Sequence, residues 1–202
     1  MKYCILITGM PGAGKSAVAL KISSYFNIRC FAKDEYKEIL FDTYGFKSRA
    51  EKVKLGTMAM EMMYADAEES MKEGNLFILD NNFENSSKEG LYDLLNKYEY
   101  TAITVRLTGD PDVIYKRYVA RDLSGTRHRG HVVNDCYPEK RGSMRDNPTR
   151  KTIEQYMEDI ETRGYNTFEA NGPLIEADVT DLSKFDYRVI IKEIKRIIAQ
   201  NS

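Results

Sequence analysis

The chain has 202 residues, of which 42% are hydrophobic and 30% are charged, and its formal net charge is −1. This length suits one domain with a sizeable core. The balanced charge excludes a general attraction to nucleic acid or to an anionic membrane, and no apolar run approaches the length of a membrane span. The N-terminal apolar stretch is too short for a signal peptide and has no cleavage site. Because the three cysteines (Cys4, Cys30 and Cys136) are odd in number and widely spaced, we expect no disulfide framework and a cytoplasmic protein.

Short apolar runs alternate along the chain with longer stretches of helical periodicity. In chain order we predict a strand at 3–7, a helix at 16–26, a strand at 28–32, helices at 35–41 and 49–72, a strand at 76–79, a helix at 88–97, a strand at 101–107, helices at 111–121 and 152–161, a strand at 174–177 and a helix at 184–199. Asp110 is the expected N-cap of the helix that begins at Pro111. Residues 123–150, rich in Gly, Arg, His and Pro, show no periodicity and predict a long loop.

Apolar strands separated by helices predict an α/β fold with a parallel sheet that is covered on both faces. The sequence shows no internal repeat and no linker, so we expect one domain over residues 1–202 with an inserted lid at about 122–150. Residues 121–151 hold eight Lys or Arg against four Asp or Glu, a local charge of +4 that leaves −5 for the rest of the chain. This asymmetry is typical of a lid that closes over polyphosphate. A nucleic-acid patch is the alternative, although Tyr137 is the only aromatic residue there.

One motif indicates the class of ligand. Residues 9–16, GMPGAGKS, match G-x-x-x-x-G-K-[ST] without a mismatch, and they lie between a predicted strand and a predicted helix, which disfavours a chance match. Glycines let backbone N–H groups turn toward phosphate oxygens, and the N-terminus of the following helix adds its dipole. We expect Lys15 to reach the β- and γ-phosphates of ATP and the Ser16 hydroxyl to ligate Mg²⁺. The expected nucleotide-binding residues of this loop are Gly9, Pro11, Gly12, Ala13, Gly14, Lys15, Ser16 and Ala17.

Asp80 ends a predicted apolar strand, which is where a second residue of the Mg²⁺ site is expected. The alternative is an aspartate that only caps a turn. The residues that follow are Asn81 and Asn82, and we expect both to face the second substrate. A motor ATPase usually has an acid at this point to polarise water, so the two asparagines favour transfer to an acceptor other than water.

Asp34 follows the second predicted strand, and ligands of open α/β sheets lie beyond the carboxyl ends of the strands. A carboxylate at this place can accept the proton of an attacking hydroxyl group, so Asp34 is the candidate general base. The alternative is that Asp34 caps the helix predicted to begin near Glu35, and one residue could have both roles.

Three arginines lie around the end of one predicted helix and the start of the long loop. Arg117 and Arg121 are four residues apart and share a helix face, and Arg127 follows them. Arginines at this place could clamp the phosphoryl group in transfer, with Arg121 and Arg127 as catalytic candidates and Arg117 and Arg121 on the nucleotide. A solvated basic face is the alternative.

The two histidines, His128 and His131, lie in the predicted lid. With Cys136 they suggest zinc, but the spacing lacks a clear fourth ligand. Contact of both histidines with the substrate or its phosphate is the favoured interpretation, and solvent exposure is the remaining one.

These features together resemble the small P-loop kinases often labelled AAA-family ATP-binding proteins. That group is related to zeta toxins, to chloramphenicol phosphotransferase and to the kinase half of phage polynucleotide kinase. The resemblance covers most of the chain. It rests on residues 9–16, on Lys33-Asp34-Glu35-Tyr36-Lys37-Glu38 with Leu40-Phe41-Asp42, on Leu79-Asp80-Asn81, on Val105-Arg106-Leu107, and on Arg117, Arg121 and 127–131.

The resemblance implies a P-loop NTPase fold with five parallel strands in the order 2-3-1-4-5, and it implies that Asp34 is the general base. Relatives often place an arginine three residues after this acid to bind the acceptor. In this sequence the position is Lys37, which keeps the charge but loses the bidentate fork of arginine.

Our main hypothesis is therefore an ATP- and Mg²⁺-dependent phosphotransferase that acts on a hydroxyl group of a small molecule. A second hypothesis keeps this chemistry but takes a 5′-hydroxyl of RNA or DNA as the acceptor, which steep salt dependence of binding would favour. A third is a nucleotide-binding regulator that hydrolyses ATP slowly and acts through a partner. The sequence does not identify the acceptor, because related proteins phosphorylate very different molecules.

Overall fold

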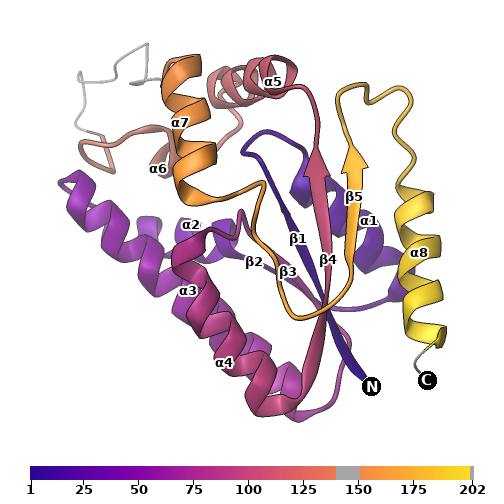
Figure 1. Cartoon of the computed structure of the whole chain (residues 1–202). Coiled ribbons are helices and arrows are strands. Elements are labelled where there is room, and N and C mark those ends of the chain that lie inside the picture. Colours follow the sequence, from indigo (N-terminus) through magenta and orange to yellow (C-terminus); the bar gives the residue numbers. More distant parts are fainter. Residues whose placement is uncertain (140–150, 201–202) are drawn as a thin grey trace.

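A computed structural model describes residues 1–139 and 151–200 (Figure 1). Its strands are β1 (Lys2–Gly9), β2 (Cys30–Ala32), β3 (Ile78–Asp80), β4 (Tyr100–Thr108) and β5 (Leu174–Asp178). Its helices are α1 (Lys15–Phe26), α2 (Lys33–Tyr44), α3 (Arg49–Lys72), the 3₁₀ turn η1 (Asn85–Ser87), α4 (Lys88–Tyr98), α5 (Pro111–Leu123), α6 (Arg129–Val132), α7 (Ile153–Arg163) and α8 (Tyr187–Gln200). No helix among these residues is long and apolar enough to cross a membrane.

The five strands form one parallel sheet in the order β2-β3-β1-β4-β5, which confirms the predicted fold and strand order. Parallel strands need crossover connections, and helices supply them between all the strands. In Figure 1 the arrowheads of β4 and β5 point to the end of the sheet where α5, α6 and α7 gather. The carboxyl ends of the strands and these three helices therefore border the same region.

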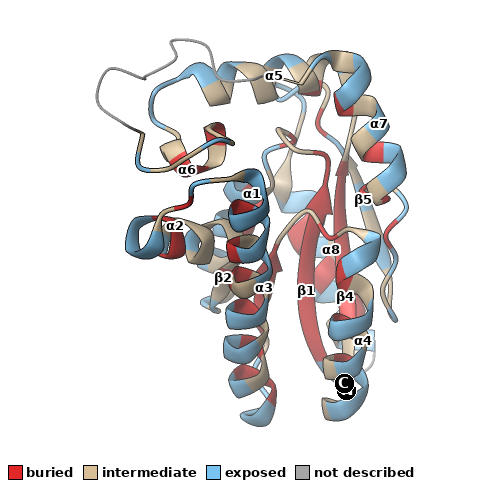
Figure 2. Cartoon of the chain, turned by 90° about the vertical axis from the view of Figure 1, so that its left-hand side faces the viewer, coloured by how far each residue is buried: buried red, intermediate tan, exposed pale blue. Residues whose placement is uncertain are grey.

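Alternate residues of the central strand β1 pack into two different hydrophobic cores. Ile5 and Ile7 of β1 belong to the cluster that packs against α1 and α8. Cys4 and Leu6 belong to the cluster under α3 and α4. This is the two-residue period of a strand that is buried on both faces, and Figure 2 shows β1 and β4 buried between helices whose outer sides are exposed.

Most predicted elements are confirmed, with shifts at their ends. Asp110 caps α5 as expected, since its side chain accepts hydrogen bonds from the N–H groups of Asp112 and Val113. The helix after β2 begins at Lys33 rather than Glu35, so Asp34 lies within its first turn and the interpretation of Asp34 as a helix N-cap is wrong.

The prediction of a structureless loop over residues 123–150 is wrong for its first half. This part contains α6, and Tyr137 forms an antiparallel bridge with Phe46. A helix of four residues is too short to produce a detectable period in the sequence. Residues 140–150 of the predicted lid lie outside the described part of the chain.

Contacts with α2 and α3 hold α6 in place. Gly130 lies against Phe41, so that a Cβ atom at this glycine would be 2.4 Å from the ring. The Nζ of Lys52, on α3, donates to the carbonyl oxygens of His131 (2.9 Å) and Val133. Residues 129–133 of the predicted lid therefore pack against α2 and α3.

We expect Phe41→Ala to lower the free energy of unfolding by about 3–5 kcal/mol, because it leaves a cavity where a fully buried ring supports both α2 and α6. Ile39→Ala, at an exposed position of the same helix, is the matched control and should change it by less than about 0.5 kcal/mol. Denaturant titration measures both values, and equal losses in the two variants would contradict this account of α6.

Candidate active site

The sheet brings three chemical groups together because their strands are neighbours. The phosphate loop follows β1, Asp80 ends β3 and Asp34 follows β2, and these strands lie in the order β2-β3-β1. Asp80 pairs in register with Ile7 of β1 and with Ala32 of β2. Neighbouring strands are about 4.8 Å apart, so side chains at their carboxyl ends meet over one short edge.

The loop between β1 and α1 has the backbone that the motif requires. Gly9 has a φ of +126°, and a Cβ atom there would lie 2.3 Å from the carbonyl oxygen of Leu107. Lys15 begins α1, and its Nζ donates to the carbonyl oxygens of Gly9 (3.0 Å) and Met10 (2.9 Å). Burial lowers the pKa of Lys15 to about 8, although Asp80 and Asp34 oppose the change. The amine is therefore held beside the loop by bonds that a phosphate could replace.

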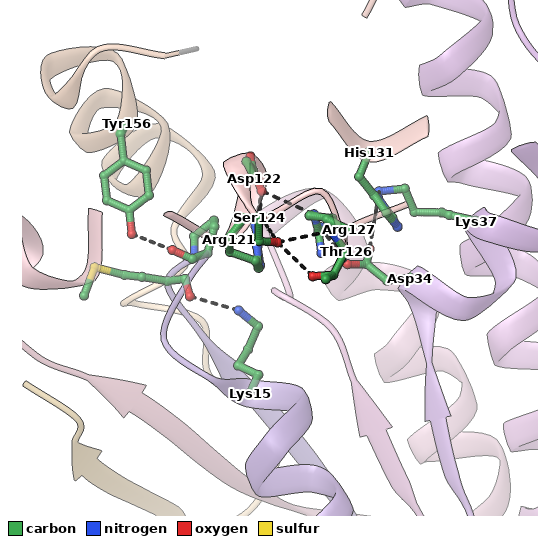
Figure 3. A network of polar contacts seen from close by, with 12 residues as sticks. Lys15, Asp34, Lys37, Arg121, Asp122, Ser124, Thr126, Arg127, His131 and Tyr156 are labelled. Atoms are coloured by element: carbon green, nitrogen blue, oxygen red, sulfur yellow. Dashed lines mark hydrogen bonds and ion pairs between the residues drawn. The ribbon is translucent and has the colours of Figure 1, made fainter. Parts of the chain in front are cut away.

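A helix that follows the predicted lid supports this loop. The hydroxyl of Tyr156, on α7, donates to the carbonyl oxygen of Pro11 at 2.7 Å (Figure 3). Gly12 lies against Tyr118 of α5, where a Cβ atom would approach the Tyr118 Cβ to 2.9 Å. No sequence motif indicated Tyr156, because its role follows from the packing of α7 on α5 and not from any local pattern.

Ser16 and Asp80 are in direct contact. The Ser16 hydroxyl donates to Asp80 Oδ2 at 2.6 Å, and Asp80 is 5% exposed. Burial raises the pKa of Asp80, against the effects of this hydrogen bond and of Lys15. A hydroxyl and a carboxylate oxygen are hard donors that suit Mg²⁺, so these two residues fit the metal that the loop implies. In the described residues no group of three or more His, Cys, Asp or Glu could hold a metal, which removes support for the zinc alternative.

Asp34 lies in a chain of alternating charges among the residues that line the cavity (Figure 3). Its Oδ1 is 3.4 Å from the Nζ of Lys37, and its Oδ2 accepts from Arg127 at 3.2 Å. Arg127 and Arg121 both pair with Asp122, at 3.3 and 3.2 Å. Burial raises the pKa of Asp34, but Lys37 and Arg127 outweigh burial and hold the pKa well below its usual range. The carboxylate is half exposed and ionised, and it faces the cavity.

The two histidines have different positions. His131 lines the cavity with a buried side chain, and its Nε2 is 2.9 Å from Glu38 Oε1. Burial lowers its pKa to about 3, so the ring is neutral at physiological pH. Because an ionised carboxylate can only accept, the proton lies on Nε2, and Nδ1 faces Lys37 at 3.5 Å.

His128 does not appear among the described residues that line the cavity. It caps α6 through Nδ1, which accepts from the N–H of Gly130, and its Nε2 bonds to Asp42 at 3.0 Å.

Arg117 lies on the cavity wall with its guanidinium already engaged. It donates to the carbonyl oxygens of Val179 and Thr180, in the segment that follows β5. The arginine thus fixes this segment against α5. Arg121, one turn on, packs over the ring of Tyr118 with its Cζ 5.5 Å from the ring centroid.

These groups surround one cavity of about 700 Å³, which Asn81 and Asn82 also line. Its lining among the described residues includes three aspartates, Asp34, Asp80 and Asp122. It also includes nine basic residues: Lys15, Lys33, Lys37, Arg49, Lys52, Arg117, Arg121, Arg127 and Lys151. Four of these, Lys33, Arg49, Lys52 and Lys151, were not assigned to the site from the sequence, because only the fold brings them to one cavity.

Comparisons with known proteins agree with this geometry. Residues 5–135, more than half of the chain, match the model of a family described as AAA domain. The chain belongs to this family of small P-loop kinases. The family expected from the sequence is thereby confirmed, and no curated protein matches the chain.

Solved structures share the fold over nearly the whole chain. A candidate kinase from Chloroflexus aurantiacus has a TM-score of 0.73 at 21% identity and covers 100% of this chain and 98% of its own. Shikimate kinase from Bacteroides thetaiotaomicron has a TM-score of 0.54 at 16% identity and covers 98% and 99%. A gluconokinase from Sinorhizobium meliloti has a TM-score of 0.52 at 15% identity and covers 95% and 88%. At these identities the likeness shows the fold.

We expect Arg127→Met to raise the pKa of Asp34 by about 1–3, because an opposite charge at ion-pair distance favours the ionised carboxylate. The pKa of Asp34 is lowered in the folded chain, so its ionised form stabilises the fold above about pH 4, and this contribution is lost as the pH falls. Carboxyl-carbon NMR titration measures the change. Arg188→Met, which removes an exposed arginine paired with Asp186, is the control, and a titration of Asp34 that Arg127→Met left unaltered would refute the ion pair.

Proposed function

We propose that this protein is a Mg²⁺-dependent phosphotransferase that moves the γ-phosphoryl group of ATP to a hydroxyl group of a small molecule. One observation carries the proposal: the phosphate loop, the Ser16–Asp80 pair and the half-exposed carboxylate of Asp34 face a single cavity. Binding of a nucleotide alone would not require an ionised carboxylate on the opposite wall. The family and the kinase fold of the solved neighbours support the same reaction class.

The nucleotide would bind at the loop. Backbone N–H groups of residues 9–16 and the N-terminus of α1 would hold the phosphates, and Lys15 would exchange its two carbonyl acceptors for phosphate oxygens. Ser16 and Asp80 would hold Mg²⁺, whose charge, when bound, offsets the charge that develops on the phosphates. Arg117 would keep Val179 and Thr180, which follow β5, where they can approach the adenine.

Asp34 would accept the proton of the attacking hydroxyl group. The acceptor oxygen forms a bond to the γ-phosphorus while the bond from that phosphorus to the bridging oxygen of ADP breaks, and the hydroxyl proton passes to an oxygen of Asp34. Asp34 lies on α2 and the loop follows β1, so the acceptor would bind between them, beside Lys37, Asn81 and Asn82.

Arg127 would interact both with the phosphoryl group and with the general base. In the structure it pairs with Asp34 and with Asp122. An incoming phosphoryl group would compete for its guanidinium, and loss of the Arg127 pair would raise the pKa of Asp34, making it a stronger base. Arg121, also held by Asp122, would stabilise the transferring group from the neighbouring position.

We expect Asp34→Asn to reduce phosphoryl transfer by about 10²–10⁴, as the loss of a general base does, while the affinity for Mg·ATP changes little. The assay incubates the protein with γ-labelled ATP and pools of nucleosides, sugars, hydroxy acids and 5′-hydroxyl oligonucleotides. Asp112→Asn, at an exposed carboxylate on α5, is the matched control.

Label confined to the oligonucleotide pool would establish the polynucleotide alternative. Nucleotide binding without transfer to any pool, unaffected by Asp34→Asn, would contradict the proposal and favour a regulatory nucleotide-binding protein.

We expect the affinity for Mg·ATP to fall about tenfold from pH 7 to pH 9, because a pKa of about 8 leaves Lys15 mostly charged at the lower pH and mostly neutral at the higher one. Calorimetry in buffers of different ionisation enthalpy should also detect proton uptake on binding near pH 8. Lys33→Met should keep this dependence and Lys15→Met should abolish it. Equal affinities of the unaltered protein at both pH values would argue against the lowered pKa.

A further inference from the structure

The positive charge of the cavity lining is larger than the negative charge that Mg·ATP would bring. Nine basic and three acidic residues among its described lining give a formal charge of +6 when every Lys and Arg is counted as protonated and His131 as neutral. Mg·ATP brings a net charge of about −2, so that about +4 remains for a second ligand. Charges of one sign held close together repel each other, and an anionic second ligand would relieve this repulsion.

Among the described residues that line the cavity, Lys33 is the basic side chain without a hydrogen-bond or ion-pair partner. Within residues 1–139 and 151–200 its side chain forms no hydrogen bond and no ion pair, although it lines the cavity. Burial, together with Lys37, lowers its pKa to about 8. The charges of Glu84 and Asp34 reach Lys33, but Glu84 is paired with Arg163 at 3.3 Å and Asp34 is paired with Lys37 and Arg127. A desolvated amine without a counter-ion is costly unless a ligand supplies one.

Lys37 lies on the same face of α2 as Lys33. The two residues are four apart on α2 and therefore lie on one helix face. Their helix follows β2, two strands away from β1 and the phosphate loop, so the ends of these strands are roughly 10 Å apart. Lys33 and Lys37 thus belong to the acceptor side of Asp34, whereas Lys15 belongs to the nucleotide side.

We propose that Lys33 and Lys37 form an anion subsite, and that the acceptor is a small hydroxyl compound that carries a carboxylate or a phosphate monoester. The inference rests on the proposed phosphotransferase function. An anion bound by these two lysines would anchor the acceptor beside Asp34, whose Oδ1 is 3.4 Å from the Nζ of Lys37. Its charge would also draw Lys37 away from that carboxylate.

The subsite can be tested without any turnover. The full chain, saturated with Mg·AMP-PNP so that the phosphate loop is filled, is treated with acetic anhydride in phosphate, malonate or chloride at equal ionic strength, and labelling of each lysine is followed by mass spectrometry. Labelling of Lys33 should slow by about threefold when the protecting anion is at twice its dissociation constant. Lys184, whose side chain is 84% exposed, is the internal control and should not respond.

Comparison of the three anions distinguishes the possible acceptors. Protection by phosphate but not malonate would assign a phosphorylated acceptor, and protection by malonate would assign a carboxylate. Labelling of Lys33 that is equal in all three solutions would overturn the subsite.

A transfer assay separates failure of the subsite from failure of the proposed function. Polyhydroxy acids are compared with their amides, and sugar phosphates with the free sugars, in the unaltered protein and in Lys33→Met. Only the anionic member of a pair should accept phosphate, and Lys33→Met should raise its KM about tenfold with little change in kcat, since a charged hydrogen bond to the ground state is lost. Lys184→Met is the matched control.

Transfer to the uncharged member alone would overturn the anion subsite and leave the phosphotransferase function standing. Protection of Lys33 with no transfer to any compound would support the subsite and contradict the phosphotransferase function.

Discussion

The concentration of basic side chains around one cavity is the constraint on which the rest of the structure depends. Much of this charge is met by backbone oxygens: Lys15 donates to Gly9 and Met10, Arg117 to Val179 and Thr180, and Lys52 to His131 and Val133. Each set of carbonyl groups belongs to a different segment that borders the cavity. The bonds that satisfy the cations therefore also hold the phosphate loop, the segment after β5 and α6 in place. A ligand that draws one of these cations toward itself would also release a segment of the wall, so binding and loop position are coupled.

Asp34 is at the centre of this charge, and its environment regulates its strength as a base. With Lys37 and Arg127 in contact its pKa is held low, which makes it a poor proton acceptor. Both contacts involve cations that anionic ligands compete for. Under the proposed function, Asp34 would become more basic when a phosphoryl group engages Arg127 and an acceptor engages Lys37, which would tie proton removal to the presence of both substrates.

The parallel sheet and the phosphate loop were predictable from the sequence, because apolar runs and the spacing of Gly9, Gly14 and Lys15 are local signals. The proximity of Ser16 to Asp80 was also predictable, because the strands that precede these two residues are neighbours in the expected strand order. In contrast, α6 was missed: its four residues are stabilised by Phe41 and Lys52, far away in the chain. The roles of Tyr156 and Lys33 could not be predicted for the same reason, because they depend on residues that are distant in the sequence and close only in the fold.

The carboxylates of the cavity also bear on whether water or a second substrate accepts the phosphoryl group. Of the three among its described lining, Asp80 is bound by Ser16, and Asp122 is shared by Arg121 and Arg127. The residue after Asp80 is Asn81, whose amide nitrogen is 3.6 Å from the sulfur of Met60, so this position supplies no base to polarise water. Asp34 is the third, and it lies on the wall formed by α2, where it contacts Lys37 and Arg127. A carboxylate that is surrounded by cations on a different wall from the phosphate loop is better suited to an anchored, anionic acceptor than to free water, and this supports the proposed transfer over hydrolysis.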